Sequence, residues 1–147
     1  MNTLTVLIQI AEPILKLSML TMLGLYFAFS NTIMTSLKGM SNGAEVMVQI
    51  NKVILNPLFI TCFVLSGISS LYFAIFGTDM MRVSGVLFFI GTTLITVGKN
   101  VPLNNALRDS THEVSRKHVW DEYLDKWVFW NHVRTVSAGA SAILMVI

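Results

Sequence analysis

The chain has 147 residues, of which 54% are hydrophobic and 12% are charged. Soluble globular domains average about 45–50% apolar and about 25% charged residues, so the composition excludes an ordinary soluble domain and indicates a membrane protein. The formal net charge is only +2, and no basic stripe indicates a nucleic acid partner. The single cysteine, Cys62, lies in an apolar run and has no partner for a disulfide or a thiolate metal site.

Four apolar stretches are each long enough to cross a bilayer as a helix. They cover residues 4–37, 53–76, 80–101 and 119–147, and the last enters the bilayer near Trp127. A hydrocarbon core about 30 Å thick needs about 20 helical residues that rise about 1.5 Å each. We therefore predict an all-α fold: an integral membrane four-helix bundle in which residues 1–147 form a single transmembrane domain.

The segments between these helices differ in polarity and length. The first, SLKGMSNGAEVMVQINK, is interrupted by Gly39 and Gly43 and then turns amphipathic, which predicts an interfacial elbow after the first helix. The second, FGTDMMR, is short, so the second and third helices are expected to form an antiparallel pair. The third is rich in charged residues and predicts a helical arm before the fourth helix.

Basic residues near the helix ends predict the orientation in the membrane. The loop between the second and third helices holds only Arg82, whereas the elbow and the arm hold Lys38, Lys52, Lys99, Arg108, Arg116, Lys117 and Lys126. The positive-inside rule places the elbow and the arm in the cytoplasm and both termini outside. No basic residue precedes the first apolar run and no small-residue cleavage signature follows it, so we expect the first helix to be retained.

Polar residues collect at the cytoplasmic end of the predicted bundle. Arg134 lies about 10 Å along the fourth helix from Trp127, because each residue rises about 1.5 Å, so its charge must snorkel, pair or face a cavity. A helix that ends near Asn100, just before Pro102, has unpaired backbone carbonyl groups, and capping of these groups explains some of the asparagines. The other asparagine side chains could form hydrogen bonds with the carbonyl and hydroxyl groups of a ligand. The asparagines at this end are Asn31, Asn51, Asn56, Asn100, Asn104, Asn105 and Asn131.

Aromatic residues accompany the arginine on the fourth helix. Trp120, Trp127 and Arg134 are spaced by seven and form one stripe, with Tyr123, Trp130 and Asn131 on its flanks. A planar, lipophilic aromatic molecule would fit between such rings. The alternative is that the tryptophans form the interfacial belt that membrane helices commonly carry.

A metal site is a further alternative on the same helix. One helical face holds His118, Glu122, Asp125 and His132, which resembles the carboxylate and histidine ligand sets of helical bundles. These residues straddle the arm and the membrane, and no second helix offers a Glu-x-x-His partner. A charged, solvated arm explains the acids more simply, so we expect neither a metal nor another cofactor.

Four blocks of the sequence resemble the anthrone oxygenase family of small four-helix membrane proteins. The blocks are GLYFAFSNTIM, QINKVILNPLF, KNVPLNNAL and WDEYLDKWVFWNHVRT, and they fall in the same order and at the same depths over about residues 20–140. The resemblance implies cofactor-independent oxygenation of an anthrone, a flat tricyclic ketone, to an anthraquinone. We expect the protein in the bacterial cytoplasmic membrane.

The implied chemistry assigns roles to the polar cluster. Arg134 would stabilise the oxyanion that develops on the substrate, and Asn100, Asn104 and Asn131 would orient the substrate, with Asn31, Asn51 and Asn56 in the same site. Trp127 and Trp130 would stack against its rings. The base would be His132, because an imidazole titrates near neutral pH, or a desolvated Lys99.

A non-enzymatic role stays open beside the oxygenase hypothesis. The same asparagine and arginine side chains would suit a membrane subunit or a carrier that binds a lipid headgroup or another small ligand. The small-residue tract SAGASA, residues 137–142, favours close helix packing, including packing across a homo-oligomer interface.

Overall fold

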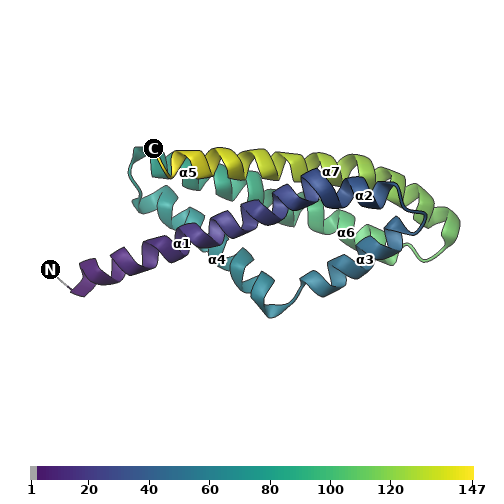
Figure 1. The fold of residues 1–147 in the computed structure, drawn as a ribbon, viewed down its shortest axis with the longest axis horizontal. Helices are drawn as coiled ribbons and strands as arrows, with labels where there is room; N and C mark the ends of the chain where they lie inside the picture. The colour runs from purple at the N-terminus through teal and green to yellow at the C-terminus, as the bar shows by residue number, and fades with distance from the viewer. Residues whose placement is uncertain (1–2) are drawn as a thin grey trace.

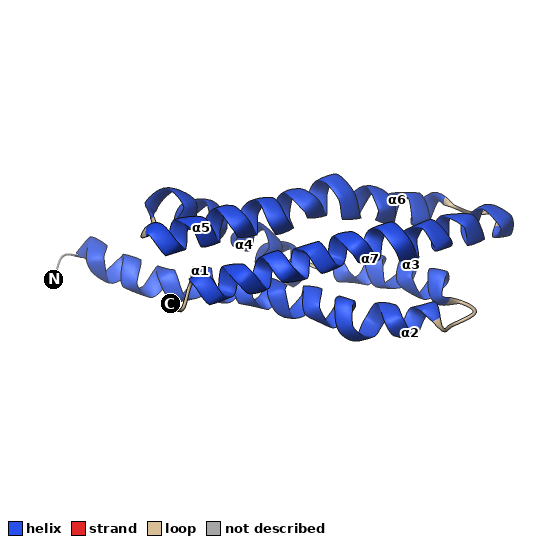
Figure 2. Ribbon diagram, turned by 90° about the horizontal axis from the view of Figure 1, so that it is seen from above, coloured by secondary structure: helices blue, strands red, loops and turns tan. Residues whose placement is uncertain are grey.

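The computed structural model describes residues 3–147, with side chains from residue 10 onward. Every regular element in this range is a helix (Figures 1 and 2), so the predicted all-α class is confirmed for the described residues. In chain order the helices are α1 (Thr3–Ala28), η1 (Phe29–Ile33), α2 (Met34–Lys38), α3 (Gly43–Ile54), α4 (Pro57–Phe76), α5 (Asp79–Phe88), η2 (Phe89–Leu94), η3 (Thr96–Asn100), α6 (Val101–Asp109) and α7 (Glu113–Leu144).

Three helical rods are long and apolar enough to cross a membrane: Ile10–Lys38, Pro57–Phe76 and Asp79–Asp109. In the first, α1, η1 and α2 follow one another directly, and in the third α5 continues through η2 and η3 into α6. Apolar side chains such as Leu17, Ile68 and Val97 remain exposed along the rods. A lipid bilayer covers such surfaces, which agrees with an integral membrane protein.

The charged arm and the last apolar stretch form one continuous helix, the 32-residue α7. It runs along α1 and α5, and these two helices both contact α4 (Figure 1). The seam between α7 and its neighbours is made by small residues. Gly91 in η2 lies directly against Ser137, and no space remains there for a Cβ atom at position 91.

The predicted second apolar stretch, which began at residue 53, contains the end of one helix and the start of another. Figure 1 shows α3 and α4 meeting at an angle. Asn56 has an extended backbone, and its side-chain Oδ1 accepts a hydrogen bond from the backbone N–H of Phe59 at 3.1 Å. Pro57 follows as the first residue of α4. An asparagine cap followed by proline starts a helix efficiently, and the membrane rod therefore begins at Pro57.

The third rod does not end near Asn100, contrary to the prediction from Pro102. The chain stays helical to Asp109 because two π-helical segments, η2 and η3, shift the hydrogen-bond register before the proline. Pro102 then occupies the first turn of α6, where a missing N–H and a fixed φ angle are tolerated. The extension carries Asn104 and Asn105 onto a helix instead of a loop.

Two buried hydrophobic clusters divide the length of the molecule. One contains Met19, Met22, Tyr26, Phe73, Phe88 and Ala138. The other contains Phe29, Met34, Leu37, Ala44, Met47, Leu107, Tyr123 and Trp127. Tyr26 from the first cluster and Phe29 and Trp127 from the second face a common cavity, so the cavity lies at their junction.

Candidate functional site

A cavity of about 450 Å³ lies between α1, α3, α4, the η3–α6 rod and α7. Sites for small organic ligands and cofactors commonly have volumes of about 300–1,000 Å³. Most of the wall is apolar; these side chains are Leu25, Phe29, Val48, Ile54, Leu55, Phe59, Ile60, Phe63, Val101 and Trp127. The remaining wall is polar and includes Arg134.

Arg134 is held in one position by contacts on several sides. Its side chain is buried, with 6% of the residue exposed. Nη1 donates to Thr96 Oγ1 at 3.1 Å, and Nη2 donates to Asn131 Oδ1 at 2.6 Å. The guanidinium carbon lies 4.6 Å from the ring centre of Tyr26 and 5.3 Å from that of Trp127. Amide, hydroxyl and aromatic groups thus orient the guanidinium beside the cavity.

No carboxylate pairs with Arg134 within the described part of the chain. The ion pairs found there involve other residues, such as Arg116 with Glu45 at 3.2 Å. A buried cation without a counter-ion is costly, and in a membrane protein it commonly marks a functional site. An anionic ligand in the cavity would supply the missing charge.

Five polar atoms of the cavity wall are buried without a hydrogen-bond partner among the described residues: Tyr26 OH, Asn51 Nδ2, Asn100 Oδ1, Trp127 Nε1 and Arg134 Nε. Buried polar groups are normally paired, and each unpaired group costs about 1–3 kcal/mol. Three of the five are N–H donors, the tyrosine hydroxyl can donate as well, and only one is an obligatory acceptor. N–H donors therefore predominate among the unpaired polar atoms of the residues that line the cavity.

A family model for anthrone oxygenase matches residues 45–144. The chain belongs to the anthrone oxygenase family. Neither a curated protein nor a solved structure matches it. The family match confirms the resemblance found in the sequence, and it includes most of the cavity wall from Val48 to Arg134. Tyr26 and Phe29 precede the matched range.

Five of the residues predicted for the site line the cavity of this anthrone oxygenase family member: Asn51, Asn100, Asn104, Trp127 and Arg134. Asn100 Nδ2 donates to the carbonyl oxygen of Trp127 at 3.2 Å. Asn104 Oδ1 accepts a hydrogen bond from the Tyr123 hydroxyl at 2.8 Å. These bonds fix both amides in the cavity wall, and the buried Asn100 Oδ1 has no hydrogen-bond partner among the described residues.

Asn131 lies behind the cavity wall. It is fully buried, and its Nδ2 donates to the carbonyl oxygen of Tyr26 at 3.0 Å and to Ser30 Oγ at 2.7 Å. Its Oδ1 accepts the hydrogen bond from Arg134. Asn131 therefore positions Arg134 and ties α7 to α1, and it is not among the residues that line the cavity.

Both predicted bases lie outside the cavity. His132 is exposed on α7, because it follows Asn131 directly and an α-helix turns neighbouring residues to different faces. Lys99 is exposed too, and its Nζ lies 5.3 Å from the ring centre of Trp130. Trp130 packs edge-on against Phe129 and does not line the cavity.

Two predicted asparagines serve local structure. Asn31 is exposed, and its Nδ2 donates to the side chain of its neighbour Thr32 at 3.3 Å. Asn56 caps α4 and also donates to the carbonyl oxygen of Val53 at 3.2 Å. Neither lines the cavity.

Tyr26, Phe29 and Thr96 also line the cavity, and none of them was predicted from the sequence. A signal for the first two was present, because Met19, Met22, Tyr26 and Phe29 recur at spacings of three and four and are all buried. Tyr26 is the one residue of that face with a polar tip. Thr96 had no such signal; it is the first residue of η3, and its Oγ1 accepts a hydrogen bond from Arg134.

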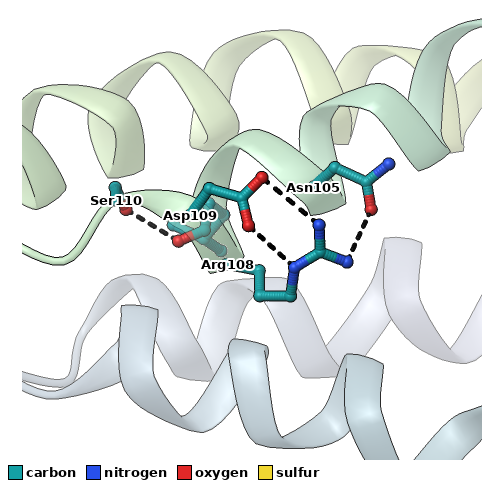
Figure 3. A network of polar contacts seen from close by, with 5 residues as sticks. Asn105, Arg108, Asp109 and Ser110 are labelled. Carbon is teal, nitrogen blue, oxygen red and sulfur yellow. Dashed lines mark hydrogen bonds and ion pairs between the residues drawn. The ribbon is translucent and has the colours of Figure 1, made fainter.

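The mouth of the cavity has one polar and one apolar edge. Arg108 stands on the polar edge between Asp109 and Asn105 (Figure 3). Its Nε lies 2.8 Å from Asp109 Oδ1, and its Nη1 lies 3.1 Å from Asn105 Oδ1. The exposed side chains of Leu55, Ile60 and Val101 form the apolar edge. Such a mouth suits the access of a lipophilic molecule from the membrane interface.

Within the described range, no three histidine, cysteine or acidic side chains converge on a point where they could hold a metal ion. Glu122, one of the residues considered for a metal site, forms an ion pair with Lys126 on the solvated part of α7. His132 lies about 1.7 helical turns beyond Lys126 on the same helix.

Proposed function

We propose that this protein is a membrane-embedded, cofactor-independent oxygenase that acts on a planar, lipophilic, anthrone-like substrate with O2. The observation that carries the proposal is the buried guanidinium of Arg134, which faces a largely apolar cavity without a counter-ion among the described residues. Membership of the anthrone oxygenase family supports the choice of substrate class.

The proposed overall reaction converts an anthrone and O2 into an anthraquinone and water. Loss of a benzylic proton gives an anion whose charge spreads onto the carbonyl oxygen. This anion transfers one electron to O2, and the resulting radical and superoxide combine and take up a proton to form a hydroperoxide. Loss of water from the hydroperoxide leaves the quinone. Catalysis of this sequence needs a stabilised oxyanion and a dry, shaped pocket.

The residues around the cavity supply those two requirements. Arg134 Nε, Trp127 Nε1 and Asn51 Nδ2 have no hydrogen-bond partner among the described residues, and we propose that they donate to the oxyanion. The apolar wall, including Phe29 and Phe59, would hold the rings and exclude water. Because His132 and Lys99 lie outside the cavity, we assign the first proton to water at the mouth, with Arg134 lowering the cost of the anion.

We further propose how the helices sit in the membrane. The three apolar rods and the second half of α7 would form a four-helix transmembrane bundle, α3 would be an interfacial elbow, and the charged first half of α7 would be the arm. The elbow and the arm would face the cytoplasm of a bacterial cell, with both termini outside. The tract 137–142 already packs within the chain through Ser137 and Gly91, which leaves its outer face for a homo-oligomer contact.

Oxygen uptake by the protein in lipid nanodiscs, with a simple anthrone and no added cofactor, tests the proposal. We expect uptake above the spontaneous rate, and a fall of about 10²–10³-fold in that excess rate for Arg134→Ala, as for other lost oxyanion donors. Arg82→Ala is the matched control, because Arg82 is exposed at the start of α5 away from the cavity. A wild-type protein that adds nothing to the spontaneous rate over a panel of anthrones contradicts the oxygenase function.

Binding of a ligand would pair the unpaired atoms of the cavity even if no reaction followed. These atoms therefore also support a second function. In that case the protein would be a non-enzymatic membrane subunit or carrier that binds a lipophilic anion or a lipid headgroup. Saturable binding of an anthraquinone without any oxygen uptake from anthrones would favour this alternative.

A further inference from the structure

The hydroxyl of Tyr26 is the least explained polar group of the cavity. Tyr26 is 3% exposed, its ring belongs to a hydrophobic cluster, and its hydroxyl lies near the hydroxyls of Thr92 and Thr96 without forming a well-aligned hydrogen bond to any described residue. A hydroxyl left unpaired in an apolar interior costs about 1–3 kcal/mol, and phenylalanine would fill the same space without that cost. Its presence therefore indicates a use at the cavity.

Tyr26 is also the buried wall residue best suited to exchange a proton. Amide and indole N–H groups do not release protons at neutral pH, and a guanidinium stays protonated. The Thr96 hydroxyl already accepts a hydrogen bond from Arg134. The other ionisable side chains of the wall, Lys52 and Arg108, are exposed at the mouth. A phenol can give a proton and recover it within one catalytic cycle.

The surroundings of Tyr26 hold it in place and set a cation beside its ring. Its carbonyl oxygen accepts a hydrogen bond from Asn131 Nδ2 at 3.0 Å, which anchors the backbone of α1 to α7. The guanidinium carbon of Arg134 lies 4.6 Å from its ring centre. A phenolate formed there would sit beside a buried positive charge that has no carboxylate partner in the described chain.

We propose that Tyr26 is a catalytic residue that turns the hydroperoxide into quinone and water; this role rests on the oxygenase function proposed above. The phenol proton goes to the distal peroxide oxygen as the O–O bond breaks, and in the same step the hydrogen on the same carbon leaves as a proton to water at the mouth of the cavity. The C–H electron pair becomes the second C–O bond as the product water is released. The phenolate beside Arg134 then recovers a proton from the water at the mouth, so Tyr26 is regenerated and no outside reductant or oxidant is consumed.

The test compares Tyr26→Phe with Tyr72→Phe in nanodiscs, measuring O2 uptake, quinone and organic peroxide in acid-quenched samples from the first turnovers. Tyr72 is half-buried in α4, packs against Phe73 and Phe76, and does not line the cavity. The wild type and Tyr72→Phe should form one quinone per O2. Tyr26→Phe should consume O2 and accumulate peroxide, with quinone formation slowed by about 10²-fold, a usual contribution of a positioned acid or base.

Each outcome separates this proposal from the oxygenase function itself. Quinone formation by Tyr26→Phe at the wild-type rate and ratio would overturn the role of Tyr26 and leave the oxygenase function intact. Absence of uptake by the wild type would overturn both. The loss of an unpaired hydroxyl should leave the melting temperature unchanged or raised. Should the variant not fold, difluorotyrosine at position 26 keeps the shape with a more acidic phenol, and a pH profile of quinone yield identical to the wild type would overturn the proposal.

Discussion

Buried polar side chains are paired in one region of this molecule and left unpaired in another. A serine seam, made of Ser18, Ser66, Ser69, Ser70, Ser84 and Ser141, joins α1, α4, α5 and α7, and each of its hydroxyls has a hydrogen-bond partner. The cavity wall buries five polar side chains that each keep an atom without a partner in the described chain. The seam is as polar as the cavity, so polarity alone does not mark a binding site.

The geometry of the seam explains why its polar groups are structural. Ser84 Oγ donates to the Ser141 carbonyl oxygen at 2.8 Å, and Ser141 Oγ donates to the Ser84 carbonyl oxygen at 3.0 Å. Small residues beside them bring the backbones close; Gly85 meets the backbone of α4 at Ser70 and Ala74. In a membrane such small, hydrogen-bonded side chains hold helices together because burial of apolar surface cannot.

The largest expected effect on stability comes from overfilling the close contact of Gly91 with Ser137, beside the serine seam, with Gly91→Leu. A Cβ at position 91 would overlap the side chain of Ser137, so η2 and α7 must separate at a cost of about 1–3 kcal/mol. The melting temperature in detergent should fall clearly. Gly98→Leu is the matched control, because open space surrounds a Cβ at position 98 on the same rod. Equal melting temperatures for the two variants would show that this contact is not tightly packed.

A pair of asparagines gives a finer test of the difference between structural and ligand-facing polarity. Asn51 lines the cavity with an unpaired Nδ2, whereas Asn56 caps α4. Asn51→Ala should weaken the binding of a hydroxyanthraquinone by about tenfold, the worth of one hydrogen bond of about 1.4 kcal/mol, without lowering the melting temperature. Asn56→Ala should cost about 1 kcal/mol of stability and leave the affinity unchanged. If both variants changed affinity and stability in the same way, the assignment of Asn51 to the ligand and of Asn56 to the helix cap would be wrong.

The fourth predicted membrane helix lies within α7, which is not among the described helices that are long and apolar enough to cross a membrane. The sequence predicted the other three rods well, because bilayer thickness dictates the length of an apolar helix. It predicted their ends less well. Pro102 looked like a helix end, yet the π-helical turns before it carry the rod on to Asp109. Leu55 lies in an apolar run, but the Asn56 cap and Pro57 divide that run into α3 and α4. The positions of these helix ends depend on the hydrogen-bond register of the backbone, which cannot be read from the composition of an apolar run.

The candidate site was predictable in part for a similar reason. Trp127 and Arg134, spaced by seven on α7, do face one cavity. The sequence could not distinguish the asparagines that cap helices from those that line the cavity, because both are the same residue type. The orientation of His132 depends on the rotation of α7, and the contribution of Tyr26 depends on how α1 packs against α7.

The central claim is that the unpaired donors of the cavity, with Arg134 foremost, bind an electron-rich oxygen of a planar ligand. It is tested most directly by titrating 1-hydroxyanthraquinone into nanodiscs that hold the wild type, Arg134→Ala or Arg82→Ala and following tryptophan fluorescence. We predict saturable binding with equal Kd for the wild type and Arg82→Ala, and a Kd about tenfold or more higher for Arg134→Ala, the effect of one charge-assisted hydrogen bond. Equal binding by all three proteins, or no saturable binding by any, would contradict the claim.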